Sequence, residues 1–314
     1  MLDLAIIGGG PAGLSAAIYA ARDGLSVRIF EKAVIGGIAT TSDLIENYPG
    51  FEDGISGFEL AKKMRAQAEK FGAKISYGEV SEIEDFGEKV RLKIDGQNLE
   101  ARSVLLAVGN SYRKLGLPRE DEFFGRGIHT CATCDGTIYS GKEIVAVGGG
   151  DSAVTEALFL SRFSKVKLLV RSKIRAQEIL QTRLQKAVEE GKIEVFLKAE
   201  IEELLFEKTE FGEKIRGVKV RQTLENGEIQ KFEIQTPAVF EFVGLIPNTD
   251  FLKKSNVRLN NFGEICVNEK FQTSSKRIFA VGDAIENAEK QIIVAAASGA
   301  KASIEISKIL HTLE

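Results

Sequence analysis

Two segments of the chain show the same succession of apolar and small residues. The first is a mainly apolar run over residues 2–7, the turn Gly8-Gly9-Gly10-Pro11-Ala12-Gly13 and a mainly apolar stretch over 14–23. The second is an apolar run over residues 143–147, the turn Gly148-Gly149-Gly150-Asp151-Ser152-Ala153 and a stretch to about Arg162. Further runs rich in branched apolar residues follow at 26–30 and 165–170. Each segment predicts a strand, a tight turn, a helix and a second strand, the order typical of dinucleotide-binding folds.

The small residues of the first turn have separate roles in such a fold. Gly8 permits the tight turn, Gly10 lets the backbone approach a pyrophosphate, and Gly13 lets the helix pack close to the strand. Free amides at the helix start attract phosphates. Glu31 ends the second strand 18 residues after Gly13, where an acid can bind ribose hydroxyls. We therefore expect FAD or NAD here and disfavour a glycine turn without a ligand.

The second turn predicts a different nucleotide. Gly148, Gly150 and Ala153 occupy the three small-residue positions, and Arg171 stands 18 residues after Ala153. A cation at this position can pair with a 2′-phosphate, and Arg175 follows one helical turn later. NADP is therefore expected. The alternative is that Arg171 is a solvated strand end.

Two of the three cysteines form the sequence Cys131-Ala132-Thr133-Cys134-Asp135. Cysteines two residues apart can exchange a disulfide with a partner through a mixed disulfide. The carboxyl group of Asp135 can deliver a proton to a leaving thiolate, and His129 is the other acid–base group nearby. A zinc half-site and an inert buried pair are the alternatives. Zinc is disfavoured because a tetrahedral site needs four ligands, so no metal is expected.

Bulk composition narrows the class of protein. The chain has 314 residues, 44% hydrophobic and 28% charged, with a formal net charge of −3. That charge gives no bulk electrostatic reason to expect nucleic acid or an acidic membrane as a partner. We find no apolar run of the ~18 residues that span a bilayer, and no signal peptide at the N-terminus. Three cysteines do not make an extracellular disulfide framework, so a cytoplasmic protein is expected.

With these residues in view, the chain resembles the low-molecular-weight thioredoxin reductases, flavoproteins with two dinucleotide folds. Beyond the glycine turns, five segments carry the resemblance over nearly the whole chain: Gly36-Gly37 with Thr40-Thr41, residues 45–50 (IENYPG), 131–136 (CATCDG), 242–249 (FVGLIPNT) and 278–284 (IFAVGDA). Lys290-Gln291-Ile292 is similar to the family's last flavin-side segment, normally Arg-Gln.

The resemblance implies a role for each matching residue. Cys134 would receive electrons from the flavin, Cys131 would attack the disulfide of the partner, and Asp135 would donate a proton. FAD would be bound by Gly8, Gly10, Pro11, Ala12, Gly13, Glu31, Lys32, Gly37, Thr40, Asn47, Gly109, Asp283, Lys290, Gln291 and Ile292. NADP would be bound by Gly148, Gly150, Asp151, Ser152, Ala153, Arg171, Ser172 and Arg175.

The expected fold is α/β, with two Rossmann-like, three-layer domains. Residues 1–113 and 245–314 would form a discontinuous FAD domain, and 114–244 an inserted NAD(P) domain that carries the Cys-x-x-Cys. Each would have a parallel sheet with helices on one face and an antiparallel layer on the other. Alternating runs at 90–94, 215–220 and 232–234, with Asp95-Gly96 and Asn226-Gly227 as turns, predict that layer.

The resemblance implies a thioredoxin-disulfide reductase that passes electrons from NADPH through FAD and the dithiol to thioredoxin or a similar small redox protein. It also implies a homodimer. The signature for the 2′-phosphate is degenerate, because Val170-Arg171-Ser172-Lys173-Ile174-Arg175 lacks a histidine and one arginine of the family pattern. An NADH-linked or a ferredoxin-linked disulfide reductase is therefore an alternative, as is a flavin redox sensor without turnover. Ile38 and Ser298 also depart from the family pattern.

Overall fold

A computed structural model describes residues 1–42, 45, 47–210 and 212–312, but not the side chain of Cys134. It divides into two compact units, Met1–Ser111 with Ile246–Glu314, and Tyr112–Leu245. The units meet in sequence at 111–112 and 245–246, close to the expected boundaries of 113–114 and 244–245. We call them unit 1 and unit 2.

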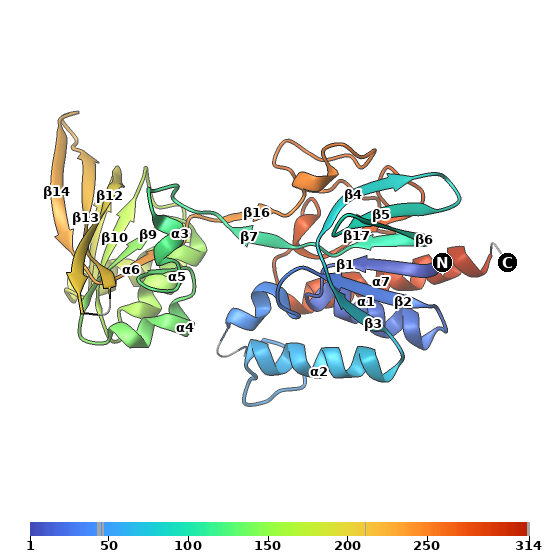
Figure 1. Cartoon of the computed structure of the whole chain (residues 1–314). Coiled ribbons are helices and arrows are strands. Elements are labelled where there is room, and N and C mark those ends of the chain that lie inside the picture. The colour runs from blue at the N-terminus through green and yellow to red at the C-terminus, as the bar shows by residue number, and fades with distance from the viewer. Residues whose placement is uncertain (43–44, 46, 211, 313–314) are drawn as a thin grey trace. The chain divides into compact units, whose positions relative to one another are not determined.

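Unit 1 is built on one sheet with the strand order β3-β2-β1-β6-β5-β4, in which β17 also pairs with β6 (Figure 1). Its strands are β1 (Leu2–Ile7), β2 (Val27–Glu31), β3 (Lys74–Tyr77), β4 (Val80–Asp85), β5 (Val90–Ile94), β6 (Gln97–Leu106) and β17 (Ile278–Ala280). Its helices are α1 (Pro11–Arg22), α2 (Gly57–Lys70) and α7 (Ile292–His311), with 3₁₀ turns η1 (Gly37–Thr41), η3 (Asp250–Leu252) and η4 (Gly282–Ala284).

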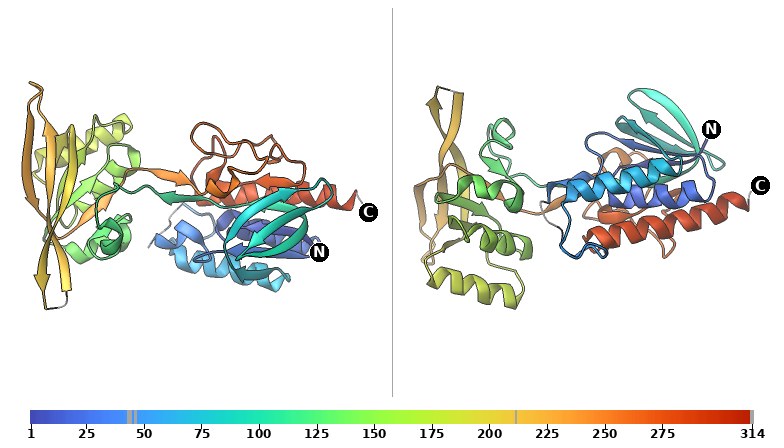
Figure 2. Two further views of the ribbon diagram at one scale, coloured as in Figure 1. Left: turned by 45° about the horizontal axis from the view of Figure 1, so that its top comes forward. Right: turned by 90° about the horizontal axis from the view of Figure 1, so that it is seen from below.

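Strand β1 is buried on both faces from Leu4 to Ile7, which explains why these four residues are all apolar. Leu4 and Ile6 join a core with α1, α2 and α7, which lie side by side with α1 in the middle (Figure 2). Ala5 and Ile7 join a second core with β4 and β5. Helix α1 begins at Pro11, three residues before the expected Leu14, because proline is well suited to the first helical position.

The antiparallel part of unit 1 belongs to the same sheet, because the long strand β6 serves both halves. Its first residues pair antiparallel with β5, and its later residues pair parallel with β1 and β17. The hairpin predicted at Asp95-Gly96 is confirmed: Ile94 pairs with Gln97, and both turn residues have positive φ.

Unit 2 has separate parallel and antiparallel sheets. The parallel sheet has the order β11-β10-β9-β15-β8, and the antiparallel sheet the order β12-β13-β14. The strands are β8 (Ile128–His129), β9 (Glu143–Val147), β10 (Lys165–Val170), β11 (Ile193–Leu197), β12 (Ala199–Thr209), β13 (Gly212–Thr223), β14 (Ile229–Gln235) and β15 (Val239–Glu241). The helices are α3 (Glu120–Phe123), α4 (Ala132–Asp135), α5 (Asp151–Leu160) and α6 (Glu178–Glu189), with the 3₁₀ turn η2 (Gly136–Tyr139).

The parallel sheet of unit 2 separates two cores. Ile144 and Ala146 of β9 pack with residues of α5 and α6, whereas Val145 and Val147 pack with the antiparallel sheet. The strand pairing predicted for 215–220 and 232–234 is confirmed, since Val218 pairs with Ile234. The chain passes between the units along β7 (Asn110–Tyr112) and β16 (Leu245–Pro247), which pair with each other.

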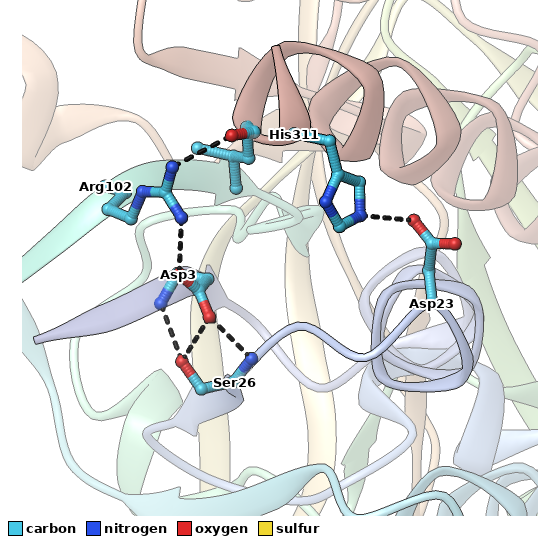
Figure 3. A network of polar contacts seen from close by, with 6 residues as sticks. Asp3, Asp23, Ser26, Arg102 and His311 are labelled. Carbon is cyan, nitrogen blue, oxygen red and sulfur yellow. Dashed lines mark hydrogen bonds and ion pairs between the residues drawn. The ribbon is translucent and has the colours of Figure 1, made fainter. Parts of the chain in front are cut away.

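The end of α7 is tied to the first strands by a polar network (Figure 3). Arg102 on β6 donates to Asp3 Oδ1 at 3.0 Å and to the carbonyl of Leu310 at 2.9 Å. His311 Nε2 lies 3.2 Å from Asp23 Oδ2 at the end of α1. Although burial raises the pKa of Asp3, hydrogen bonds from Ser26 and Arg102 outweigh it and leave that pKa below its ordinary value. Within the described residues, no helix combines the length and apolar character needed to cross a membrane.

Candidate functional site

The first glycine turn joins β1 to α1 in a conformation that requires glycine at two positions. Gly8 has a φ of +104°, and a Cβ there would lie 2.2 Å from the carbonyl oxygen of Ala107. A Cβ on Gly13 would lie 2.1 Å from the carbonyl oxygen of Gly8. At Gly10, by contrast, no described atom lies within 4 Å of the Cβ position. The backbone is therefore closely packed around Gly8 and Gly13 and open at Gly10.

Glu31 is fixed at the end of β2 beside this turn. Its carboxylate accepts hydrogen bonds from the amide of Gly9 at 2.7 Å and from the amide of Ala33 at 2.8 Å. The loop that follows returns to the turn, since the amide of Gly36 donates to the carbonyl of Gly9 at 2.8 Å. A Cβ on Gly37 would lie 3.7 Å from Gly10 Cα. The acid, the first turn and the start of η1 therefore lie together.

The C-terminal segment brings further predicted flavin residues near each other. Asn47 Nδ2 donates to Gln291 Oε1 at 3.0 Å, across 244 residues of sequence. Asp283 lies in η4, where burial raises its pKa and the charge of Lys290 partly offsets that effect. Glu46, which belongs to the matching segment 45–50, lies outside the described residues.

The remaining predicted flavin residues are placed by backbone structure. Pro11 and Ala12 form the first turn of α1, and Ile292 begins α7. Thr40 lies in η1 and donates through Oγ1 to the carbonyl of Gly37 at 2.8 Å. Lys32 is exposed and lies 3.4 Å from Glu79. Gly109 has a positive φ, and its carbonyl accepts a hydrogen bond from the amide of Asn248.

The second glycine turn repeats the geometry of the first within unit 2. Gly148 has a φ of +145°, and a Cβ there would lie 2.4 Å from the carbonyl oxygen of Phe242. It would also lie 2.6 Å from the Cβ of Ala153, which is fully buried. At Gly150, as at Gly10, no described atom lies within 4 Å of the Cβ position. Ser152 is exposed in the first turn of α5.

The segment after β10 folds over this turn. The amide of Arg175 donates to the carbonyl of Gly149 at 2.6 Å. Asp151, the first residue of α5, accepts hydrogen bonds from the amide and side chain of Gln177 at 2.7 and 2.9 Å. Gln177 was not predicted from the sequence, because no local pattern indicates its contact with the distant Asp151.

The residues predicted to bind a 2′-phosphate are exposed at this segment. Arg171, Ser172 and Arg175 all lie at the surface of unit 2. Neither guanidinium has a hydrogen bond or ion pair with another described residue. Since Arg175 is held next to Gly149 through its backbone, its side chain starts beside the glycine turn and is available to an anion there.

The Cys-x-x-Cys lies at α4 in unit 2. Cys131 is disulfide-bonded and half-buried, and its Sγ lies 3.3 Å from Thr133 Oγ1. The side chain of Cys134 lies outside the described part of the structure. Cys266, in unit 1, is a buried free thiol. Among the described residues, no group of three or more histidine, cysteine or acidic side chains could hold a metal ion.

Asp135 ends α4 and faces a buried histidine. Its Oδ2 lies 3.0 Å from Nδ1 of His129, whose side chain is only 2% exposed. The other ring nitrogen of His129 faces Gly127 and Tyr139. Burial lowers the pKa of His129, and the charge of Asp135 only partly compensates. His129 is therefore a neutral imidazole at neutral pH.

A second carboxyl group faces the start of α4. Glu156 on α5 accepts a hydrogen bond from the amide of Ala132, although burial still raises its pKa. Sequence reasoning missed Glu156 because a single acid within a predicted helix cannot be distinguished from an ordinary surface acid. The two acids approach α4 from different elements, Asp135 from the helix itself and Glu156 from α5.

Both glycine turns fit a dinucleotide. At the helix start each has a glycine, Gly10 or Gly150, whose Cβ position meets no described atom within 4 Å and where an alanine methyl group would fill the space. Both residues are N-caps, and neither helix start carries a side-chain cap among the described residues. Helices α1 and α5 thus offer amides and a positive dipole end to phosphate groups.

Comparison with known proteins agrees with this geometry. The family model for pyridine nucleotide-disulphide oxidoreductases matches residues 2–299. The thioredoxin reductase of Bacillus subtilis strain 168 is 38% identical over 314 residues, which cover 99% of this chain and 95% of the Bacillus protein.

Two solved structures are similar over the whole chain. The thioredoxin reductase of Lactococcus lactis in its FR conformation has a TM-score of 0.84 at 36% identity, and the match covers 99% of this chain and 100% of that one. The thioredoxin reductase of T. acidophilum has a TM-score of 0.82 at 34% identity, and the match covers 100% of this chain and 99% of that one. The expected α/β, Rossmann-like fold is therefore confirmed. This chain is an oxidoreductase that belongs to the low-molecular-weight thioredoxin reductases of the pyridine nucleotide-disulphide oxidoreductase family.

Proposed function

We propose that this protein uses NADPH to reduce the disulfide of thioredoxin, or of a similar small redox protein. The net reaction is NADPH + H⁺ + disulfide → NADP⁺ + dithiol. One observation carries the proposal: the Cys-x-x-Cys-Asp sequence lies on the same unit as a glycine turn open to a dinucleotide, in a chain related to thioredoxin reductases over its full length.

We assign FAD to unit 1 and NADPH to unit 2. FAD supplies, when bound, a two-electron carrier between nicotinamide and disulfide. Gly10 would admit its pyrophosphate to the start of α1, and Glu31 would face the ribose. The Asn47–Gln291 pair and Asp283 would bind the rest of the FAD molecule. Gly150 would admit the pyrophosphate of NADPH, and Arg171 and Arg175 its 2′-phosphate.

Disulfide exchange follows from the dithiol. The Cys131 thiolate attacks the partner's disulfide, so that a Cys131–partner bond forms while the partner's own S–S bond breaks. The partner's leaving thiolate takes a proton from Asp135. The Cys134 thiol then gives up its proton and attacks Cys131 Sγ, which forms the Cys131–Cys134 disulfide and releases the second partner thiolate, and that thiolate takes up the proton. The partner leaves as a dithiol, and the Cys-x-x-Cys of this chain remains as a disulfide.

The proposal also specifies the electron donor, which we take to be NADPH. An intact turn at Gly148–Ala153 and two arginines that have no partner among the described residues support NADPH. The missing histidine and arginine in residues 170–175 support an NADH-linked or ferredoxin-linked reductase as the second candidate. We further propose a homodimer and a cytoplasmic location, in keeping with family resemblance and with a chain of only three cysteines.

Anaerobic titration tests the proposal most directly. The yellow protein is mixed with NADPH and, in parallel, with NADH, and the flavin absorbance is followed before thioredoxin disulfide is added. Bleaching by NADPH followed by turnover supports the proposal. Turnover only with reduced ferredoxin supports the second candidate. Bleaching without turnover on thioredoxin or other small disulfide proteins contradicts the reductase function and supports a redox sensor.

A further inference from the structure

The segment that follows β10 is packed onto the second glycine turn. A Cβ on Gly149 would lie 2.8 Å from Cγ1 of Val170 and 3.1 Å from the carbonyl oxygen of Lys173. The amide of Arg175 donates to the carbonyl of Gly149 at 2.6 Å. Residues 170–175 therefore run directly against the turn to which we assign the pyrophosphate of NADPH.

The end of the same segment is anchored by the carboxylate of Asp151. Its Oδ1 accepts the backbone N–H of Gln177 at 2.7 Å, and its Oδ2 accepts the side-chain amide of Gln177 at 2.9 Å. Asp151 is the first residue of α5, and Gln177 is the N-cap of α6. One residue thus engages both carboxylate oxygens and joins the starts of the two helices.

The backbone between these two anchors is also held from below. Ala176 is only 4% exposed and belongs to the core shared with α5 and α6, against which Ile174 packs. The carbonyl of Ala176 accepts a hydrogen bond from the side chain of Gln181 on α6 at 2.6 Å. Arg175, between Ile174 and Ala176, is exposed. The core contacts therefore fix the backbone while the arginine side chain faces outward.

This arrangement gives Asp151 a different role from the one that its position in the glycine turn indicates. The sequence placed Asp151 among the residues that would bind NADP, but its carboxylate is engaged by Gln177. A carboxylate also repels phosphate groups. Its contribution to a nucleotide would be indirect, through the segment that carries Arg171 and Arg175. A binding segment that is already ordered costs less to bring into a complex.

We propose that Asp151 is a positioning residue for the 2′-phosphate of NADPH: by holding Gln177 it fixes residues 171–175 on the glycine turn, so that Arg171 and Arg175 need little ordering when the phosphate binds. This inference rests on the proposed function, which assigns NADPH to unit 2. It accounts for a preference for NADPH in a segment that lacks a histidine and one arginine of the family pattern, because fewer cations are held more firmly.

Two adenosine nucleotides isolate the 2′-phosphate from the rest of the coenzyme. Adenosine 2′,5′-bisphosphate and adenosine 5′-monophosphate differ only in that group, and neither carries nicotinamide, so their binding needs no electron transfer. Isothermal titration calorimetry of the whole, flavin-loaded protein gives a dissociation constant for each. We expect the bisphosphate to bind at least about 10-fold more tightly to the unaltered protein, because it gains charge-assisted hydrogen bonds from the two arginines.

Substitutions at Asp151 test its role in this preference. Asp151→Ala removes both acceptors, and the loosened segment should reduce the preference for the bisphosphate about 5- to 10-fold. Asp151→Asn keeps an oxygen for the backbone N–H of Gln177, and its amide nitrogen can donate to the Gln177 side chain once that amide is turned round. The Asn variant should therefore keep the preference. Glu178→Ala removes an exposed carboxylate next to Gln177 without touching the pair, and serves as the control.

The sign of the effect separates positioning from charge. If Asp151 acted only through its negative charge, the Ala and Asn variants would both lose a repulsion and bind the bisphosphate more tightly. An unchanged or increased preference in Asp151→Ala would therefore overturn the proposal. So would an Asn variant as impaired as the Ala variant, or an equal loss of preference in Glu178→Ala.

Hydrogen exchange adds a measurement that needs no ligand. The amide of Arg175 bonds to Gly149 and does not itself contact Asp151. It should exchange faster in Asp151→Ala than in the unaltered protein, and as slowly as before in Asp151→Asn. Equal exchange in all three proteins would overturn the proposal. Exchange at β9 and β10 shows whether a variant has lost the fold of unit 2 as a whole.

Failure of the proposed function would look different. If the unaltered protein binds the two nucleotides equally, it has no 2′-phosphate site, and both the NADPH assignment and the positioning role of Asp151 are wrong. If it prefers the bisphosphate but reduces no thioredoxin, only the disulfide substrate is wrong, and the comparison of the Ala and Asn variants still decides the role of Asp151. If only the positioning role is wrong, the preference persists in Asp151→Ala.

Discussion

The hydroxyl of Ser298 on α7 accepts a hydrogen bond from the backbone amide of Gly282 at 3.1 Å, and it donates to the carbonyl of Ala295 at 2.8 Å. Gly282 starts the turn η4 that carries Asp283. Ser298 on α7 therefore restrains the turn η4, which carries the proposed flavin residue Asp283. This contact gives a physical role to a residue that departs from the family pattern, a role that sequence alone did not suggest.

Replacement of Ser298 by Ala should weaken FAD retention. The amide of Gly282 is buried, so the loss of its hydrogen bond to Ser298 costs about 1–3 kcal/mol. We expect part of this cost to appear as reduced order of the turn η4. We expect faster release of flavin on dilution or gel filtration, with turnover per bound flavin little changed. Ser303 on the same helix is the matched control, since its buried hydroxyl has no partner among the described residues. Ser303→Ala should leave flavin retention unchanged; equal loss in both variants would contradict this role of Ser298.

Alanine at Gly10 and at Gly150 should separate the two nucleotide sites. Neither Cβ meets a described atom within 4 Å, and both residues have negative φ, so both variants should fold. Each methyl group would occupy the space needed by a pyrophosphate. Gly10→Ala should yield a nearly colourless protein, whereas Gly150→Ala should stay yellow but resist reduction by NADPH.

A third alanine variant serves as the contrast. In Gly13→Ala the Cβ would lie 2.1 Å from a backbone oxygen, so this variant should lose stability rather than only a ligand. Circular dichroism melts and the flavin-to-protein absorbance ratio distinguish these outcomes. A folded Gly10→Ala protein with a full complement of FAD would remove the first turn from the flavin site.

Arg171 and Arg175 should determine the preference for NADPH over NADH. Both guanidinium groups are exposed without described partners, and a 2′-phosphate would give each a charge-assisted hydrogen bond. Arg171→Gln and Arg175→Gln should each raise KM for NADPH about 10-fold, equivalent to about 1.4 kcal/mol. KM for NADH should not change. Arg183→Gln, an exposed arginine on α6, is the control; a parallel rise in both KM values would indicate a structural effect instead.

The local parts of the fold could be predicted from the sequence because sterics and periodicity act over a few residues. The bounds of β9 and β10 agree with their apolar runs, and Gly8 and Gly148 have the positive φ that tight turns require. Strand β12 was not predicted. Its acidic sequence from Ala199 to Thr209 is interrupted by two register irregularities, which break the alternation of period two.

Long-range contacts could not be predicted, because the local sequence pattern does not indicate which distant residue a side chain will contact. The contacts between His129 and Asp135 and between Gly282 and Ser298 depend on loops that return from other elements. The same holds for Gln177 at Asp151, which was found only in the structure. Sequence reasoning proposed the residues of this site, and the structure adds the contacts that those residues make with distant parts of the chain.

Two buried acids near the end of β15 should make stability fall as pH rises. Glu241 is 1% exposed, and burial together with the neighbouring Glu120 raises its pKa to about 9. Glu120 already accepts the amides of Leu115 and Leu117, so a protonated Glu241 can donate a hydrogen bond to it. A proton shared in this way would join the segment that leads into unit 2 to the strand that leads out of it.

The sign of the pH effect follows from these values. Unfolded Glu241 ionises near 4.5, whereas folded Glu241 keeps its proton until about pH 9. Between these limits the folded state binds more protons, so the free energy of unfolding decreases with pH, by at most about 1.4 kcal/mol per unit. Glu241→Gln keeps a donor for Glu120 and does not ionise. Its thermal midpoint should therefore exceed that of the unaltered protein by more at pH 8.5 than at pH 5.5. The exposed Glu225→Gln should show no such trend, and a pH-independent difference for Glu241→Gln would rule out the shared proton.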